Sequence, residues 1–158
     1  ALLWDQVTNA GVPDVQAVWM HECGGSRMFT ALSIKQRYGG HAKQAGLIAS
    51  QCGVGDYAGK FVVVVDDDID VTNLDDVMWA VSTRCDPVDS IDIIRNTWST
   101  PLDPRISPSS REARDFTNSR AIIDACRPFA WRDKFPRVNM PTPEVAKKAW
   151  DKFSYLLK

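Results

Sequence analysis

The sequence predicts a single layered α/β domain, in which helices flank a mixed, mostly parallel β-sheet. Short apolar runs rich in β-branched residues alternate along the chain with segments of helical periodicity. The clearest strand covers residues 61–65 (FVVVV) and is apolar at every position, which is typical of a strand buried on both faces. The length of 158 residues is that of one domain with a core of its own.

The first half of the chain gives one helix, two strands and a second helix. Residues 2–7 have apolar positions at near-helical spacing, and Gly11 marks the end of that helix. Residues 15–20 (VQAVWM) and 28–34 (MFTALSI) are predicted strands joined by a polar connection that contains glycine. A helix over residues 41–51 follows a pair of glycines.

The second half continues the alternation. A helix is expected to begin at Thr72 or Asn73, because either side chain can accept a hydrogen bond from the first helical turn. Asp75 lies in that turn, near the positive end of the helix dipole. Residues 90–96 and 121–125 are predicted strands.

Two segments lack a regular pattern. Residues 98–118 are rich in Pro, Ser and Arg and are predicted to form a long irregular loop. Residues 127–142 form a Pro-rich surface arm that leads into the last helix. That helix is well marked, with Thr142 as its N-cap and Pro143 at its first position.

The composition excludes several classes of protein. Hydrophobic residues make up 44% of the chain and charged residues 25%, as in a soluble globular protein. The formal net charge is 19 − 20 = −1, so no global field attracts nucleic acid or an anionic membrane, and we expect neither as a partner. The longest apolar run is far too short to span a bilayer.

The cysteines and the start of the chain bear on its origin. The four cysteines are widely spaced and form no CxxC pair, which argues against a structural zinc site. With no visible signal peptide, they favour a reducing, cytoplasmic compartment. The chain starts with Ala1 and enters a helical pattern at once, so we expect a fragment or a processed chain.

The strongest candidate for charged chemistry is an acidic cluster. Asp66, Asp67 and Asp68 stand at the carboxyl end of the predicted strand 61–65, the edge where open α/β sheets bind ligands. Such carboxylates can hold a divalent metal or accept a phosphoryl group. The structural alternative is that they pair with an arginine, and Arg84, one helix later, is the expected partner.

Two other polar stretches have a functional and a structural interpretation. The glycine turn at residues 38–43 (YGGHAK) could bind an anion through backbone N–H groups and Lys43, or could be a tight turn in which His41 fixes the helix start. His21, Glu22 and Cys23 suggest a nucleophile with a base, as in a Cys–His hydrolase. That reading is disfavoured, because nothing supplies a third group or an oxyanion hole.

Three segments, taken together, resemble the C-terminal part of UbiD-family enzymes, reversible decarboxylases that use prenylated FMN. They are residues 38–43 (YGGHAK), 60–70 (KFVVVVDDDID) and 77–87 (VMWAVSTRCDP), and their order and spacing make the set specific. The resemblance covers nearly the whole chain, from about Pro13 to the final helix. The ferulic acid decarboxylases of the family are more distant, sharing the DDID and STRC stretches and lacking the glycine–histidine turn.

The resemblance implies a division of labour. In the family, the prenylated flavin bonds to an aromatic or α,β-unsaturated acid and stabilises the charge left when the carbon–carboxylate bond breaks. The catalytic Glu–Arg–Glu (or Asp) set and the metal ligands belong to an N-terminal cofactor-binding domain. The full-length enzyme is therefore expected to use prenylated FMN with a divalent metal (Mn or Mg) and K. We expect no catalytic residue, metal or cofactor on this chain, and no activity from it alone.

The resemblance also suggests six substrate-pocket residues and an oligomer contact. The six are Trp19, Met20, His21, Thr100, Pro101 and Leu102. Thr100 stands where ferulic acid decarboxylases have an aromatic residue, which argues against a cinnamate-like substrate. In the family this domain also forms the dimer contact, and the final helix with its Pro-rich arm is the candidate surface for a homodimer or higher homo-oligomer.

Two alternatives to this function stay open at the level of sequence. One is a regulatory domain of the receiver type, which would use Asp66, Asp67 and Asp68 to bind Mg²⁺ or accept a phosphoryl group. Receiver domains place their acidic pair after the first strand, whereas two predicted strands precede this one. The other is a natural subunit of a split decarboxylase, whose partner chain would bind the cofactor.

Overall fold

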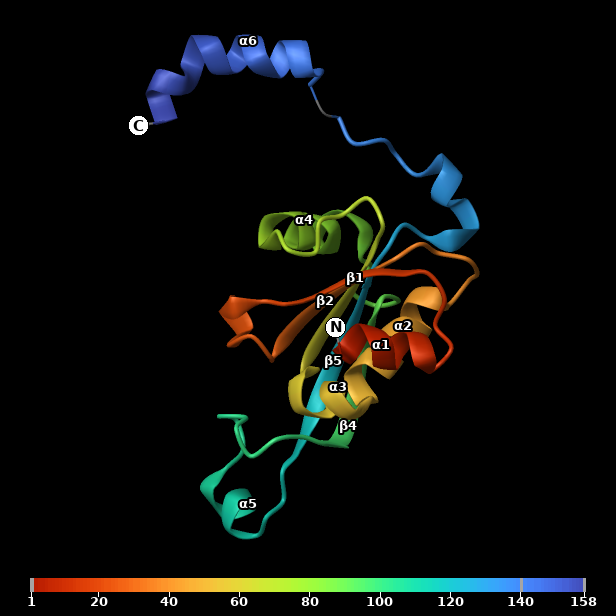
Figure 1. Cartoon of the computed structure of the whole chain (residues 1–158), viewed down its shortest axis with the longest axis vertical. Helices are drawn as coiled ribbons and strands as arrows, with labels where there is room; N and C mark the ends of the chain where they lie inside the picture. The colour runs from red at the N-terminus through yellow and green to blue at the C-terminus, as the bar shows by residue number, and fades with distance from the viewer. Residues whose placement is uncertain (1, 140, 158) are drawn as a thin grey trace.

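A computed structural model of the chain, which describes residues 2–139 and 141–157, has a five-stranded β-sheet with helices on both faces (Figure 1). The strands are β1 (Val15–Met20), β2 (Phe29–Ile34), β3 (Phe61–Asp66), β4 (Ile91–Trp98) and β5 (Thr117–Ala125). Their order across the sheet is β1-β2-β3-β5-β4. The central strands β2, β3 and β5 are parallel, and each edge strand is antiparallel to its neighbour. The predicted fold class, a mixed and mostly parallel sheet flanked by helices, is confirmed.

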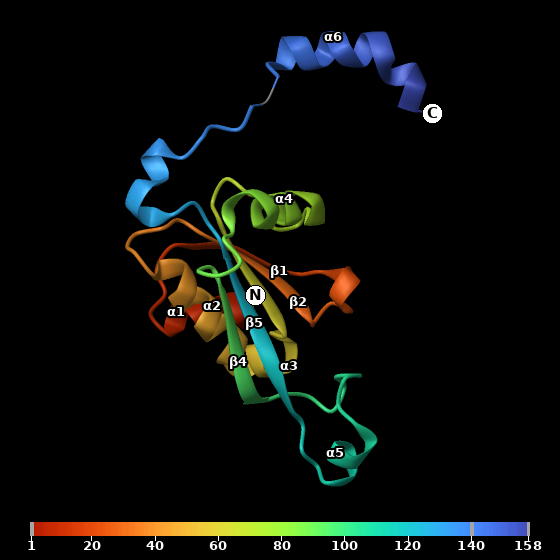
Figure 2. The ribbon, with the colours of Figure 1, turned by 180° about the vertical axis from the view of Figure 1, so that it is seen from behind.

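Three helices cover the first face of the sheet. They are α1 (Leu2–Asn9), α2 (His41–Gln51) and α3 (Gly53–Ala58). Val7 of α1 and Ala45 of α2 pack with Val64 of β3 in one buried apolar cluster. Gly46 lets α2 approach β5 closely, because a Cβ atom there would lie 2.4 Å from Cγ2 of Ile122. Figure 2 shows α1 and α2 beside each other next to the strands, with α4 (Leu74–Arg84) above them.

Helix α4 covers part of the second face. Its residues Val77 and Ala80 are fully buried against Ala31, Val63 and Val65 of the sheet. The apolar residues of β3 thus alternate between the two clusters, as expected for a strand buried on both faces. This alternation confirms the interpretation of the FVVVV run.

Three elements differ from the prediction. Helix α3 is not signalled by the sequence, since two of its six residues are glycine. Strand β5 begins at Thr117, four residues before the predicted strand, and its early residues Asn118 and Arg120 are polar. The segment 98–118 is only partly irregular, because both of its ends belong to strands and it contains the short helix α5 (Pro108–Glu112).

The C-terminal elements leave the body of the domain. The segment η2 (Phe129–Lys134) is followed by an arm, by α6 (Pro143–Phe153) and by η3 (Ser154–Leu157). Figures 1 and 2 both show the arm carrying α6 away from the sheet, beyond α4. The predicted cap is confirmed, since Oγ1 of Thr142 accepts a hydrogen bond from the N–H of Val145 at 3.4 Å. Among the residues that the structure describes, no helix has the length and apolar character needed to cross a bilayer.

Candidate functional site

The second face of the sheet is only partly covered. Because α4 packs over Ala31, Val63 and Val65, it covers the half of this face nearer the carboxyl ends of the parallel strands. Side chains two residues apart in a strand share a face. Phe29 and Phe61, which begin β2 and β3, therefore lie on this same face at its amino half.

The strand register aligns apolar side chains into one row there. Phe29 pairs with Phe61, Phe61 with Ala121, and Ala121 with Ile93. The N–H of His21 donates to the carbonyl oxygen of Phe29 at 2.9 Å, which places His21 at the β1 end of the row. Phe61 is 43% exposed and Ile93 is 55% exposed. These five residues are called the apolar row below. His21 and Ala121 are buried, and the exposed members Phe61 and Ile93 form an open surface of the kind that marks a binding face.

A pocket of about 600 Å³ lies beside the amino end of the sheet, between the β1–β2 turn and the loop that follows β4. Its lining residues are Cys23, Gly24, Gly25, Arg27, Met28, Leu102 and Pro104. Leu102 is the predicted substrate residue in this lining, and its side chain is exposed. The pocket thus brings the loop of Leu102 against the β1–β2 turn, which follows the predicted residues Trp19, Met20 and His21 in the chain.

The loop that carries Leu102 is held in place by the buried carboxylate of Asp103. Both oxygens of Asp103 accept hydrogen bonds from Nζ of Lys60 at 3.0 Å, and one accepts from Nδ2 of Asn118 at 3.0 Å. The N–H of Arg105 donates to Asp103 at 2.9 Å. Burial alone would raise the pKa of Asp103, but these partners hold its pKa below the usual value. The loop is thereby tied to β5 and to the start of β3.

The structure separates the six predicted pocket residues. Trp19 pairs with Ala31 and lies on the face of the apolar row, together with His21. Met20 lies on the opposite face and packs with the α1 and α2 cluster, because neighbouring residues in a strand alternate between faces. The role of Met20 in a substrate pocket stays a prediction. Trp19 and Met20 nevertheless both line a separate pocket at the edge of the sheet, beside β1, and Leu3 belongs to the same lining.

The three predicted loop residues, 100–102, also lie in different environments. Thr100 is buried, and its Oγ1 accepts a hydrogen bond from the N–H of Leu102 at 3.2 Å, so it shapes the turn, and its place in a substrate pocket stays a prediction. Pro101 is exposed, and its carbonyl oxygen accepts a hydrogen bond from Arg111. Leu102 is the member of this set that reaches an open cavity.

Sequence reasoning missed most of the apolar row. Phe29 and Phe61 each stand at the start of a strand that was recognised, and Ile93 lies in a third. Their alternation pattern assigns a face to each within its own strand. Which residues stand side by side depends on the register between strands, and the sequence of one chain does not give that register.

The carboxyl end of the parallel strands carries a different, charged arrangement. The side chain of Asp66 is 4% exposed and accepts hydrogen bonds from Nη1 of Arg84 at 3.0 Å and from Nε2 of Gln36 at 2.7 Å. Arg127 adds its backbone N–H at 2.7 Å and its Nε at 3.0 Å. Arg84 also holds Asp68 with two hydrogen bonds of 2.9 Å, and these keep the pKa of Asp68 below its usual value.

This network favours the structural interpretation of the acidic cluster. The predicted pairing of Arg84 with the aspartates is confirmed. A metal ion at Asp66 would have to displace the buried guanidinium of Arg84 as well as Arg127. Within residues 2–139 and 141–157, no three His, Cys, Asp or Glu side chains are grouped so as to hold a metal ion.

The glycine turn before α2 is also structural. Gly40 has φ of 85° and precedes His41, which is fully buried. Nδ1 of His41 accepts from the N–H of Arg37 at 3.3 Å, and Nε2 lies 3.1 Å from the carbonyl oxygen of Pro13. Burial lowers the pKa of His41, which favours the neutral ring that this pair of contacts requires. The interpretation that His41 fixes the helix start is confirmed.

Comparison with known proteins decides the family. The model of the 3-octaprenyl-4-hydroxybenzoate carboxy-lyase C-terminal domain, UbiD_C, matches residues 1–125. The chain belongs to this family. It is 35% identical over 147 residues to the phenolic acid decarboxylase of Escherichia coli O157:H7, covering 92% of this chain and 29% of that protein. The resemblance drawn from three sequence segments is thereby confirmed.

Solved structures of UbiD-class enzymes have the same fold. HmfF from Pelotomaculum thermopropionicum, in complex with FMN, matches with a TM-score of 0.76 and 30% identity over 90% of this chain and 30% of its own. The open form of vanillic acid decarboxylase from Sedimentibacter hydroxybenzoicus matches with a TM-score of 0.72 and 31% identity over 99% of this chain and 32% of its own. This UbiD C-terminal domain thus spans less than a third of each of these relatives.

The residues of this UbiD C-terminal domain do not fit a metal-bound flavin phosphate. The described residues hold no metal-binding cluster, and the carboxylates at the end of β3 are bound by arginines. What the amino end of the sheet offers instead is an apolar wall, which can orient an apolar group and exclude water.

Proposed function

We propose that this chain is the substrate-wall and oligomer-contact domain of a prenylated-FMN-dependent decarboxylase acting on an aromatic or α,β-unsaturated carboxylic acid. In the full-length enzyme, a separate domain would hold the prenylated FMN, with Mn or Mg and K. The apolar row is the observation that carries the proposal, because Phe61 and Ile93 are exposed on the amino half of the second face, beyond the part that α4 covers. The aromatic substrates named for its relatives, phenolic and vanillic acids, suit an apolar wall.

Two side chains are assigned specific roles in this wall. Leu102 stands on a loop fixed by Asp103, so its side chain can contact the apolar part of a substrate without the loop reordering. His21 is 3% exposed, and its Nε2 has no hydrogen-bond partner among the described residues. That nitrogen is the polar group of the row, and we propose that it pairs with the docked cofactor-binding domain or the substrate.

Reconstitution tests the proposal. The chain is mixed with the flavin-binding domain of a UbiD relative and prenylated FMN, and decarboxylation of a panel of phenolic and α,β-unsaturated acids is measured. We expect activity only when both proteins are present. Decarboxylation by this chain without the second domain would contradict the division of labour.

In the same assay, Leu102→Ala is expected to change the ratio of kcat/KM between large and small acids by about tenfold, since removing buried apolar contacts costs about 1–3 kcal/mol. Val88→Ala is the matched control, because Val88 is exposed in the turn before β4, at the other end of the sheet. Equal losses for every acid, in step with a lower Tm, would assign Leu102 a structural role only.

We further propose that α6 forms the contact with a second copy of the chain. Every described residue of α6 is exposed, yet Val145, Ala149, Trp150 and Phe153 fall on one helical stripe. A helix with an apolar stripe gains little stability alone in water, and most of its stability comes from packing. A self-complementary contact of two copies would bury both stripes.

Trp150→Glu is expected to shift the chain from dimer to monomer, because it replaces the largest apolar side chain of the stripe by a charge. Sedimentation velocity at several concentrations measures the change. Lys147→Glu also alters the charge of the helix but lies off the stripe, and it should leave the dimer in place. Unchanged sedimentation of the Trp150→Glu protein would contradict the contact.

Two further expectations concern the cellular compartment and the possible origin of the chain as a subunit. The four cysteines are free, in line with a reducing, cytoplasmic compartment. The alternative of a natural subunit of a split decarboxylase predicts that the intact mass of the isolated protein equals that of its complete gene product.

A further inference from the structure

The helices that follow the neighbouring parallel strands β2 and β3 pack on opposite faces of the sheet. After β2 the chain leads into α2, which packs on the first face of the sheet, and after β3 it leads into α4, which packs on the second. In open α/β sheets, such a divergence opens a crevice outside the carboxyl ends of the two strands, and ligands bind there. This edge is opposite to the end that carries the apolar row.

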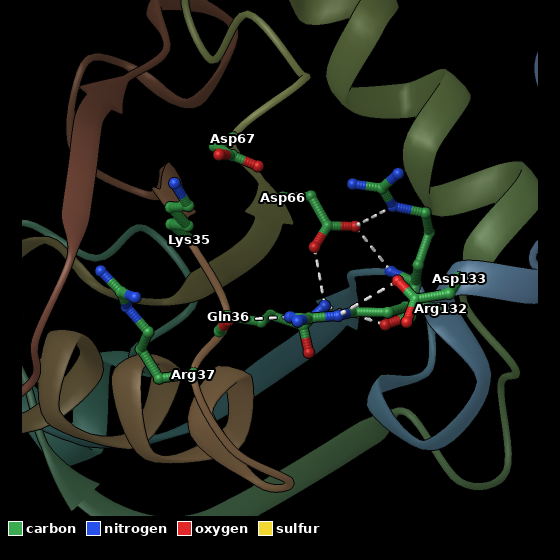
Figure 3. A pocket seen from close by; sticks show the side chains of 8 residues that line it. Lys35, Gln36, Arg37, Asp66, Asp67, Arg132 and Asp133 are labelled. Carbon is green, nitrogen blue, oxygen red and sulfur yellow. Dashed lines mark hydrogen bonds and ion pairs between the residues drawn. The ribbon is translucent and has the colours of Figure 1, made fainter.

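A pocket occupies this crevice. Its volume is about 390 Å³, within the range of small-molecule sites. Its lining comes from the segments after β2, β3 and β5 and consists of Lys35, Gln36, Arg37, Asp66, Asp67, Arg127, Arg132 and Asp133. Figure 3 shows Lys35 and Arg37 on one side of the hollow and Arg132 on the other.

The charges of the lining leave a positive surplus. Four lining side chains are basic and three are acidic, which gives 4 − 3 = +1. Asp66 is already compensated by the buried Arg84, which stands outside the lining, and the side chain of Asp133 is 95% exposed. Arg37 is likewise compensated by Asp14, which also stands outside the lining, so the positive surplus of the pocket is small and rests on the basic groups that lack a close carboxylate.

Two of the basic groups are least compensated. Arg37 is paired with Asp14, and Arg127 with Asp66. No ion pair joins Lys35 to a carboxylate in the described part of the chain. Arg132 has its nearest carboxylate at 3.8 Å, on Asp133, and donates through Nη1 to the carbonyl oxygen of Gln36 at 2.9 Å.

We propose that this pocket binds a phosphate-bearing small molecule, with Lys35 and Arg132 as its principal contacts. An ammonium and a guanidinium facing each other across a crevice suit an anion with several acceptor oxygens. The lining has no aromatic or aliphatic residue, so it lacks the wall that an aromatic acid would require. The site is thus distinct from the proposed substrate wall and stands whether or not that function is correct.

Calorimetric titration of the 158-residue chain with inorganic phosphate, glycerol phosphate and benzoate tests the proposal. Chloride keeps the ionic strength constant, because screening alters every charged contact. We expect both phosphates to bind and benzoate not to bind. Tighter binding of glycerol phosphate identifies a phosphorylated metabolite, and equal binding identifies free phosphate as the ligand. Benzoate binding as tight as that of phosphate, or no binding of either phosphate, overturns the proposal.

The variant Lys35→Gln/Arg132→Gln is expected to weaken phosphate binding by at least about tenfold, since each charge-assisted hydrogen bond contributes roughly that factor. The matched control is Arg95→Gln/Arg105→Gln, which removes the same charge from exposed positions outside the crevice. Both variants are checked for an unchanged Tm. Equal weakening by the two variants would show that net charge, and not this pocket, attracts phosphate.

Discussion

Asp66→Ala is expected to lower the free energy of unfolding by about 3–5 kcal/mol, the usual cost of removing one partner from a buried ion pair. The side chain of Arg84 is only 2% exposed. Without Asp66, the buried positive charge of Arg84 keeps Asp68 as its one carboxylate partner among the described residues. Gln36 also loses an acceptor in a buried position. Against a typical domain stability of about 5–15 kcal/mol, this is a large fraction. Urea denaturation followed by circular dichroism measures it.

Asp67→Ala is the matched control for this substitution. Asp67 is the next residue along the chain, is exposed, and has no hydrogen bond or ion pair among the residues that the structure describes. Its replacement is expected to change stability by no more than about 0.5 kcal/mol. The double variant Asp66→Ala/Arg84→Met should be more stable than Asp66→Ala alone, because it removes a buried charge that the half-exposed Asp68 compensates only in part. Equal effects of the two aspartates would contradict the network.

The elements that the sequence predicts correctly are those with local signals. The FVVVV run needs no partner to be recognised as a buried strand. Asn73, one of the two predicted caps of α4, accepts from the N–H of Asp75 at 3.0 Å. Thr142 and Pro143 likewise begin α6 as their residue types require. In each case a few neighbouring residues determine the structure.

The features that the sequence does not predict depend on contacts between distant residues. Helix α3 has weak intrinsic preference and is held from outside, for example by Oε1 of Gln6, which accepts from the N–H of Val54 at 2.9 Å. The apolar row depends on the register of four strands, and the phosphate crevice on which face each helix takes. The resemblance supplied the family, but it does not tell that Met20 packs with the α1 and α2 cluster while His21 lies on the other face.

Arg120→Met is expected to destabilise the domain by about 3–5 kcal/mol, because it leaves several buried carbonyl oxygens without a donor. Arg120 is 1% exposed. Its guanidinium donates to the carbonyl oxygens of Ser50 at 2.8 Å, Asp56 at 2.6 Å and Trp98 at 2.7 Å, and to that of Gly55. One side chain on β5 thus holds the α2–α3 junction against the end of β4. Burial lowers the pKa of Arg120 from its usual value.

Hydrogen exchange distinguishes this role from a general loss of stability. Because three of the four carbonyl groups belong to the end of α2 and to α3, the amides of α3 should exchange faster than those of α4 in the Arg120→Met protein. Arg120→Lys keeps the charge but offers three donors in place of a planar fork, so an intermediate loss is expected. Arg95→Met, at an exposed position of β4, is the control and should leave both quantities unchanged. Uniform acceleration over both helices would contradict the idea that Arg120 acts by bracing α3, since a brace protects most strongly the element it touches.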